Sequence, residues 1–224
     1  MHDASLRNLP LYFYRPASAP RAMVFFFGND VGFWAAHEAL AERYAVDGIA
    51  VAGFDVRKWM SDLPADNASR DSAFTLVLPG LIDRARHELS ADTVPMLLGG
   101  HSIGAELALW VAAHDCFDQL VGVLAMSPGE RGHLRATLDD LAEREPTEPG
   151  SFAVADVMAS IPSNIRVALI RGSRDALGAG DSSFTHAGGA RFHRYVVPLA
   201  GHSMQRLTIA GPVISAATRF LLGQ

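Results

Sequence analysis

Residues 94–113 read VPMLLGGHSIGAELALWVAA, in which Ser102 stands between Gly100 and Gly104. A short apolar run precedes the Gly-His-Ser-Ile-Gly motif, and apolar residues at helical spacing follow it. The first run is typical of a buried strand and the second of a helix. The two glycines indicate a connection too tight for side chains at their positions. This part of the chain therefore predicts a strand, a sharp turn and a helix, with Ser102 at the corner.

A serine on such a corner holds its hydroxyl clear of the backbone, at the N-terminus of the following helix. The amide of Ile103 can there donate a hydrogen bond to an oxygen that becomes negatively charged during a reaction. The alternative interpretation is a glycine-rich connection between strand and helix that contains an incidental serine. The two interpretations differ in whether a base and an acid accompany Ser102.

The composition bounds the class of protein. The 224 residues are 49% hydrophobic, enough to bury one sizeable core, and predict a single domain over 1–224. Lysine and arginine total 19 against 24 aspartates and glutamates, with no basic run, which argues against a nucleic-acid partner. The single cysteine, Cys116, excludes an internal disulfide and a cysteine-based metal cluster, and we expect it to be inert packing.

No uninterrupted apolar run reaches the length of a membrane span. The first twenty residues include Asp3, Arg7 and Pro10 and do not form the apolar core of a signal peptide. We therefore expect a soluble, cytoplasmic protein without an integral membrane segment, or a periplasmic one if an export signal has been removed.

Short apolar runs alternate with helical patterns along the chain, which favours an α/β fold with a mostly parallel central sheet and helices on both faces. The predicted strands lie at 11–14, 22–27, 49–54, around 96–98, 120–126, 165–170 and 194–199. The predicted helices lie at 33–46, 71–89, 103–113 and 207–222, the second with a kink or break at Pro79-Gly80. Residues 56–70 form a polar segment between the third strand and the second helix.

The segment 129–163 is polar and rich in proline and charge. We expect it to be a small irregular excursion after the sixth strand of the sheet, able to serve as a small lid.

A serine, an aspartate and a histidine, which together can form a catalytic triad, each follow the end of a predicted strand. Ligands bind at the carboxyl ends of strands in such sheets, and Ser102, Asp175 and His202 all lie just beyond them. A serine hydroxyl needs a base within hydrogen-bond reach, and a histidine oriented by a buried carboxylate supplies one. The chain order of serine, acid and histidine is the one that accompanies a Gly-x-Ser-x-Gly corner.

Other residues compete for the last two positions. Asp181 or Asp156 could replace Asp175, whose alternative role is to cap a turn. His202 is the best-placed of nine histidines, because it follows the exit of the last predicted strand. The other histidines weighed lie at the wrong end of that strand or are expected to face solvent: His186 and His193 for the first reason, and His87, His114 and His133 for the second.

A second donor to the oxyanion is expected from the loop after an early strand. Gly28 lets the backbone approach closely, so the amide of Asn29, or that of Asp30, can point inward. The alternative is a plain tight turn. Asp30, Trp34 and His101 are candidates for contacts with the substrate. No HExxH, CxxC, DxDxDG or GxGxxG pattern occurs, so we expect neither a metal nor a cofactor.

These residues together resemble the α/β-hydrolase superfamily over roughly residues 10–223. Within it, the chain is similar to the bacterial virulence protein family of VirJ and AcvB. The resemblance rests on four stretches: FFFGNDVGFW (25–34), GIAVAGFDVRKW (48–59), GHSIGAEL (100–107) and MSPGERGHL (126–134). It implies the α/β-hydrolase fold and a serine hydrolase with Ser102, Asp175 and His202 as its triad. In the AcvB branch it implies hydrolysis of aminoacylated phospholipid in the periplasm.

The leading hypothesis is therefore a serine hydrolase that cleaves a carboxylic ester, from a small molecule or a lipid, through an acyl-enzyme intermediate. Two alternatives stay open. One is a binding protein that keeps the fold without turnover, and the other is thioester cleavage or perhydrolysis on the same triad.

Overall fold

A computed structural model describes residues 11–61, 74–114, 117–134, 142, 144–147, 150–203 and 211–224. Within these residues, the main sheet has seven strands in the spatial order β1-β3-β2-β4-β5-β8-β9. The strands are β1 (Leu11–Tyr14), β2 (Ala22–Phe27), β3 (Ile49–Phe54), β4 (Met96–His101), β5 (Leu120–Met126), β8 (Arg166–Gly172) and β9 (Phe192–Val197). β1 pairs antiparallel with β3, and the other neighbours pair in parallel. The prediction of a mostly parallel sheet is confirmed.

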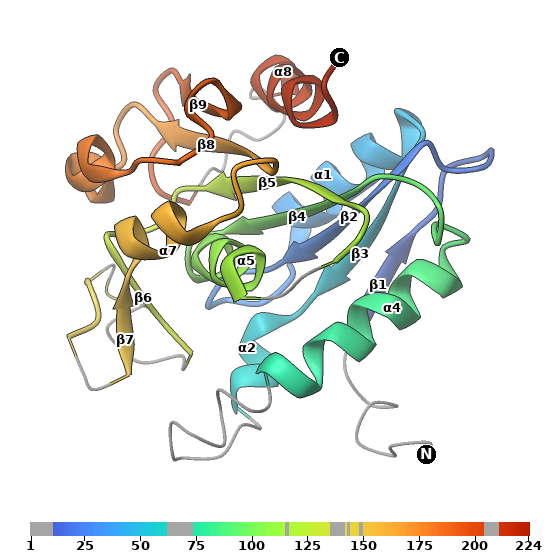
Figure 1. Cartoon of the computed structure of the whole chain (residues 1–224), viewed down its shortest axis with the longest axis horizontal. Helices are drawn as coiled ribbons and strands as arrows, with labels where there is room; N and C mark the ends of the chain where they lie inside the picture. Colours follow the sequence, from blue (N-terminus) through green and yellow to red (C-terminus); the bar gives the residue numbers. More distant parts are fainter. Residues whose placement is uncertain are drawn as a thin grey trace.

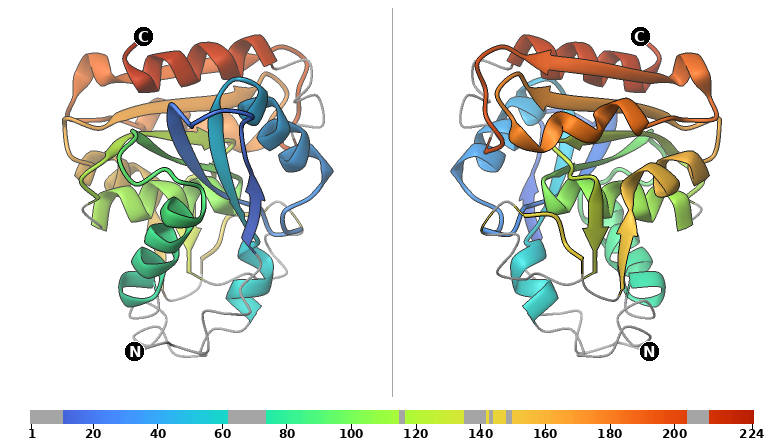
Figure 2. Two further views of the ribbon diagram at one scale, coloured as in Figure 1. Left: turned by 90° about the vertical axis from the view of Figure 1, so that its right-hand side faces the viewer. Right: turned by 90° about the vertical axis from the view of Figure 1, so that its left-hand side faces the viewer.

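Helices cover both faces of this sheet, as predicted (Figure 1). They are α1 (Ala35–Val46), α2 (Val56–Ser61), α4 (Leu78–Glu88), α5 (Ile103–His114), α7 (Val154–Ser160) and α8 (Gly211–Leu222), with 3₁₀ helices η2 (Ala176–Ser183) and η3 (Gly189–Arg191). α1 and α8 lie on one face, while α4, α5 and α7 lie on the other. The side views of Figure 2 show α8 and α4 on opposite sides of the strands.

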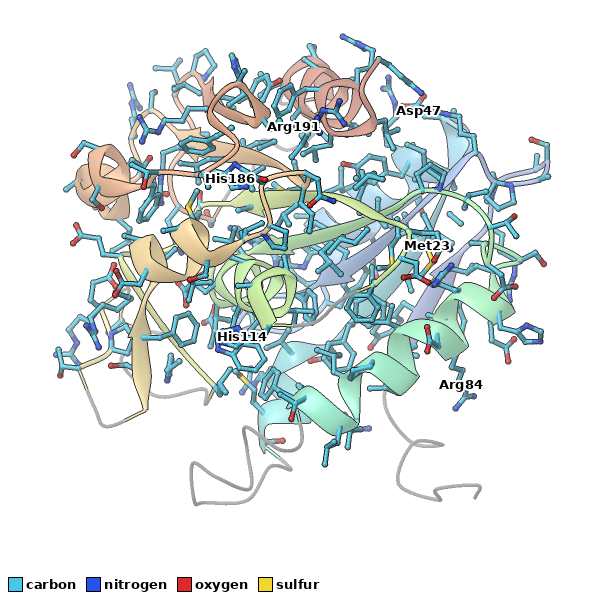
Figure 3. All side chains as sticks on the ribbon, in the orientation of Figure 1. Met23, Asp47, Arg84, His114, His186 and Arg191 are labelled. Atoms are coloured by element: carbon cyan, nitrogen blue, oxygen red, sulfur yellow. The ribbon has the colours of Figure 1, made fainter. Side chains whose placement is uncertain are left out.

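Successive residues of the central strands divide between two cores, because side chains alternate across a strand. In β2, Phe25 and Phe27 pack toward α4 and α5, whereas Phe26 packs toward α1. All six residues of β2 are buried, and fully burying one such phenylalanine contributes roughly 1.5–3 kcal/mol. Met23, labelled in Figure 3, lies in the α4 side core with no exposed surface. Burial on both faces explains why these strands read as continuous apolar runs.

One helix was not predicted, and another is interrupted as predicted. α2 opens the polar segment 56–70, where Asp55 accepts the Lys58 N–H at 3.0 Å and Trp59 packs in the core. Residues 74–76 are helical, Val77 is a turn and α4 begins at Leu78, so the predicted kink or break at Pro79-Gly80 is a break just before Pro79. Pro79 lies in the first turn of α4, where a missing N–H costs no intrahelical bond. Residues 62–73 lie outside the described part of the chain.

The boundaries of the last strand and helix also shift. β9 begins two residues earlier than predicted and lies at one edge of the sheet, and Pro198 follows its end. α8 begins at Gly211, and the predicted start at 207 lies outside the described residues.

The excursion is more regular than predicted. It follows β5, the fifth strand of the chain and not the sixth, and contains a two-stranded antiparallel pair, β6 (Arg131–His133) and β7 (Ser151–Ala153), before α7. The Glu145 carboxylate accepts the N–H groups of Glu130 and Arg131 at 2.8 and 2.7 Å, which fixes the start of β6. Within the segment 129–163 that was expected to form a lid, residues 135–141, 143, 148 and 149 lie outside the described residues, as does Cys116.

No helix among the described residues combines the length and the apolar character needed to span a bilayer.

Candidate active site

Ser102 occupies a strained corner between β4 and α5. Its φ angle is 54°, in a region that costs a residue with a side chain roughly 1–3 kcal/mol. A Cβ at Gly100 would lie 2.0 Å from the carbonyl oxygen of Gly104, and a Cβ at Gly104 would lie 2.0 Å from that of Gly28. The close approach of three backbone segments therefore requires both glycines of the motif.

The backbone on either side of Ser102 is anchored. Its N–H donates to the carbonyl of Met126 over 2.9 Å, and its own carbonyl accepts the N–H groups of Ala105 and Glu106 at 2.8 and 3.2 Å. Ile103 is the first residue of α5, where an N–H has no carbonyl partner within the helix. The corner thus carries a hydroxyl next to a helix N-terminal amide.

Ser102, His202 and Asp175 form one hydrogen-bonded row. His202 Nε2 lies 2.9 Å from Ser102 Oγ, and His202 Nδ1 lies 3.2 and 3.4 Å from the two carboxylate oxygens of Asp175. The three residues follow β4, β9 and β8, which are parallel and end at the same edge of the sheet. Of the alternative acids, Asp181 pairs with an arginine and Asp156 is exposed on α7.

The side chain of Asp175 has no exposed surface, and it has two further partners besides His202. Arg171 Nη1 lies 2.8 Å from its Oδ2, and the Leu177 N–H donates to its Oδ1 over 3.1 Å. Burial by itself raises the pKa of this carboxyl, but the hydrogen bonds from His202 and Arg171 and the guanidinium charge outweigh burial and hold the pKa well below its usual range. Asp175 is therefore ionised wherever the protein is folded near neutral pH.

Arg171 is itself held from three sides. Its guanidinium bonds Asp181 through Nε at 3.1 Å and Nη2 at 2.5 Å, and Nη2 also donates to the Pro128 carbonyl over 2.6 Å. Burial lowers its pKa, but the hydrogen bonds and charges of Asp181 and Asp175 more than compensate and raise the pKa above its ordinary value. A permanently charged group thus lies directly behind the acid of the row.

The loop that carries His202 is bound to the end of β8. The Leu199 N–H donates to Ser173 Oγ over 2.8 Å, and the Arg174 N–H donates to the Ala200 carbonyl over 2.9 Å. Leu199 has a φ angle of 62°, so the loop makes a strained turn before His202. These contacts hold the loop upstream of His202 and leave the histidine itself to other partners.

His101 is not a substrate-facing residue, so that prediction is wrong. It has no exposed surface; its Nε2 lies 2.8 Å from the backbone carbonyl of His202 and its Nδ1 lies 3.1 Å from His37 Nε2. Burial lowers the pKa of His37 to about 3 and that of His101 to about 4. The reason is topological: the residue before the corner ends a buried strand, and its side chain points into the core beneath the site.

The loop at 28–32 lies against the N-terminus of α5. The Asn29 N–H donates to the Gly32 carbonyl over 3.3 Å, and the Gly32 N–H donates back over 2.9 Å, so the amide predicted to face the oxyanion already has a long bond. The Asn29 side chain accepts the Val31 N–H at 3.2 Å. Asp30 is partly exposed, and the half-buried ring of Trp34 lies edge-on to His37 at 5.6 Å.

The remaining histidines divide as follows. His87 and His114 are exposed, as predicted, whereas His133 is buried in β6, so its predicted exposure is wrong. His133 lies between α5 and β7, where the excursion packs on the main body. In the described part of the chain, no group of three or more histidines, cysteines or carboxylates is arranged to hold a metal ion.

Sequence reasoning missed two residues of this region. Arg171 ends the apolar run of β8 as a lone charge, which is a signal for a buried partner. His37 lies three residues before Leu40 on the inward face of α1, a position typical of the core. Neither signal identifies the partner, which is His101 on β4 for His37, and Asp175 and Asp181 after β8 for Arg171.

No protein-family model matches this sequence, and no curated protein matches it either. Solved structures do match over nearly the whole chain. Est1E from Butyrivibrio proteoclasticus superposes with a TM-score of 0.66 at 12% identity, covering 96% of this chain and 94% of that one. A soluble variant of monoglyceride lipase from Saccharomyces cerevisiae superposes with a TM-score of 0.63 at 13% identity, covering 94% and 91%. A dienelactone hydrolase from Anabaena variabilis gives 0.62 at 15% identity, covering 95% and 90%.

At these identities the similarity shows the fold. The predicted α/β-hydrolase fold is confirmed, and the narrower resemblance to the VirJ and AcvB family stays a prediction.

Proposed function

We propose that this chain is a serine hydrolase that cleaves a carboxylic ester through an acyl-enzyme intermediate. One observation carries the proposal: Ser102 Oγ lies 2.9 Å from His202 Nε2, and His202 Nδ1 lies 3.2 Å from the Asp175 carboxylate. A serine and a base at hydrogen-bond distance, with the base in contact with an ionised acid, is the arrangement that activates a hydroxyl.

In the proposed reaction, Ser102 Oγ attacks the acyl carbon while His202 Nε2 takes the hydroxyl proton. His202 then gives this proton to the leaving alcohol, and the ester C–O bond breaks. Asp175 accepts a hydrogen bond from His202 Nδ1, which keeps Nε2 free to act as the base and stabilises the imidazolium. Water, deprotonated by His202, attacks the acyl-serine and releases the carboxylic acid.

The oxyanion is proposed to accept hydrogen bonds from two amides. The Ile103 N–H at the start of α5 is the first donor. The second is the Asn29 N–H, which exchanges its 3.3 Å bond to Gly32 for the oxyanion, or the neighbouring Asp30 N–H. The proximity of Gly104 to Gly28 supports this pairing, because it brings the loop and the helix N-terminus together.

The substrate is proposed to be a small-molecule or lipid ester, bordered by Asp30 and Trp34. An esterase and a lipase among the structural neighbours support this class. The resemblance to the VirJ and AcvB family narrows it to an aminoacylated phospholipid. A panel of p-nitrophenyl esters of increasing acyl length, matching thioesters and an aminoacylated phosphatidylglycerol would rank these candidates.

The test is covalent labelling by a fluorophosphonate probe together with hydrolysis of p-nitrophenyl acetate. We expect the probe to attach to Ser102, located by mass spectrometry of the digested protein. Ser102→Ala should abolish labelling and lower turnover by as much as ~10⁶-fold, since the residues of a triad act as a unit. The matched control is Ser183→Ala, at an exposed serine outside the row, which should label and turn over normally.

A wild-type protein that neither labels nor hydrolyses any ester or thioester would support the alternative of a binding protein on the same fold. Turnover that survives Ser102→Ala would refute the proposed nucleophile.

A further inference from the structure

Two buried imidazoles connect the start of α1 to the backbone of His202. His37 is 1% exposed and His101 is 0% exposed. His37 Nε2 lies 3.1 Å from His101 Nδ1. The other ring nitrogen of His101, Nε2, lies 2.8 Å from the backbone carbonyl oxygen of His202. The two rings lie 5.4 Å apart, centroid to centroid, and His101 lies 5.8 Å from the ring of His202.

The acceptors settle where the protons are. A carbonyl oxygen can only accept, so His101 Nε2 must carry the proton that it shares with the His202 carbonyl. Protonating both nitrogens of a fully buried ring beside a second imidazole is disfavoured by desolvation. His101 Nδ1 therefore accepts, and His37 Nε2 donates to it. The backbone N–H of Trp34 lies 3.5 Å from His37 Nδ1, which suits an acceptor there, and the Gly32 carbonyl also interacts with the His37 ring.

We infer that His101, oriented by His37, is a positioning residue for the catalytic base: its Nε2–H holds the main chain of His202 in register with Ser102. This inference rests on the proposed function. His101 directly precedes the nucleophile Ser102 in the chain. Its backbone is therefore bonded to Ser102, and its side chain binds the backbone of the base, His202.

Among the described residues, no other hydrogen bond holds the main chain of His202. The hydrogen bonds from the residues after β8 hold Leu199 and Ala200, three and two residues upstream, and Leu199 lies in a strained turn. The Asp175 carboxylate binds the His202 ring and not its backbone. Loss of the His101 donor removes this partner of the His202 carbonyl and lets the imidazole shift relative to the hydroxyl that it must deprotonate.

The first measurement needs no substrate. Long-range ¹H–¹⁵N correlation spectra of the ¹⁵N-labelled protein report which ring nitrogen is protonated. We expect neutral Nε2–H tautomers for both His37 and His101 from pH 7.5 down to pH 5.5. A charged ring or an Nδ1–H tautomer at His101 in this range would overturn the inference.

The second measurement uses a pair of variants that differ in one donor. Glutamine reaches with its amide nitrogen to the place of His101 Nε2, whereas methionine has nearly the same length and no donor. With p-nitrophenyl acetate, His101→Met should lower kcat by roughly 10- to 100-fold with little change in KM, and His101→Gln should retain kcat within about threefold. The fluorophosphonate labelling rate should fall in parallel.

Equal losses in both variants, or an unchanged kcat in folded His101→Met, would show a packing role only. Should His101→Met not fold, His37→Met serves instead: it removes the donor to His101 Nδ1, and we expect His101 to populate both tautomers and kcat to fall. A single unchanged tautomer there contradicts the inference.

The two proposals fail separately. A wild-type protein that is inert toward esters and the probe, yet has both Nε2–H tautomers, refutes the hydrolase and upholds the hydrogen-bonded chain. A wild-type protein that reacts with the probe and hydrolyses esters, but has the Nδ1–H tautomer at His101, supports the hydrolase and refutes the positioning role of His101.

Discussion

The Asp175 carboxylate interacts with both His202 and Arg171. Both partners hold its pKa down, so the stability that this carboxylate contributes is present above its unfolded pKa of about 3.9 and is lost as the pH falls below that value. The arginine has a second effect. Its charge opposes the imidazolium that forms on His202 during catalysis, because both cations share one carboxylate.

Replacing Arg171 by Met should therefore shift the pH dependence of kcat/KM. Without the guanidinium, Asp175 favours the protonated imidazole more strongly, and the acidic limb should move to higher pH by about one unit or more. Arg171→Lys keeps a charge and should shift the limb less. An acidic limb that stays in place, or moves to lower pH, in a folded Arg171→Met protein would contradict this electrostatic role.

The same substitution has a cost in stability. Arg171 also binds Asp181 and the Pro128 carbonyl, and breaking a buried ion pair on one side typically costs about 3–5 kcal/mol. The pH profile must therefore be measured below the unfolding temperature of the variant.

At the scale of elements, the close fit between α5 and the loop after β2 is the part that tolerates least change. Gly104 stands where a Cβ would meet the Gly28 carbonyl, a backbone atom that cannot rotate away. At Gly80, on α4, there is room for a side chain, because no atom lies within 4 Å of an added Cβ.

These two glycines should respond to alanine in opposite ways. Gly104→Ala should lower the free energy of unfolding by about 1–3 kcal/mol or more and impair the corner that carries Ser102. Gly80→Ala should raise it by about 0.5–1 kcal/mol, because glycine is a poor helix former. Urea denaturation measures both. Equal effects of the two substitutions would mean that the backbone contact at Gly104 is relieved by movement of the loop.

For the whole molecule, two buried neutral histidines make stability depend on pH. Burial lowers the pKa of His37 to about 3 and of His101 to about 4, while both return to about 6.5 on unfolding. The unfolded chain thus binds more protons between these limits. Stability is complete above pH 6.5 and falls as the pH decreases through 6.5. The buried His186, whose pKa is also lowered by burial, acts in the same direction.

We expect the free energy of unfolding to fall by about 2–3 kcal/mol between pH 7.5 and 5.5 from His37 and His101 together. Urea denaturation at a series of pH values measures this slope. His87→Gln, at an exposed histidine, should leave the slope unchanged, whereas His37→Gln should reduce it. A flat profile over this range in the wild-type protein would mean that both rings titrate normally in the folded state, and a fall half as large would mean that one of them does.

The sequence by itself determined the layers of the molecule and the row of three side chains. Continuous apolar runs bounded β2, β3 and β5 to the residue, because strands buried on both faces leave no polar position to obscure them. The glycines around Ser102 indicated the corner, since only backbone contact demands them. The alternation of strands and helices then implied that Ser102, Asp175 and His202 meet at one edge of the sheet.

The tertiary structure alone decided the partners. His101 looked like a residue at the mouth of a site, and it became a buried donor because His37, 64 positions away, and the His202 carbonyl, 101 positions away, converge on its ring. Likewise, the start of β6 is fixed by the carboxylate of Glu145, 14 and 15 positions away. Periodicity and motifs report contacts within a few residues of the chain, whereas these hydrogen bonds depend on distances that exist only once the strands have paired.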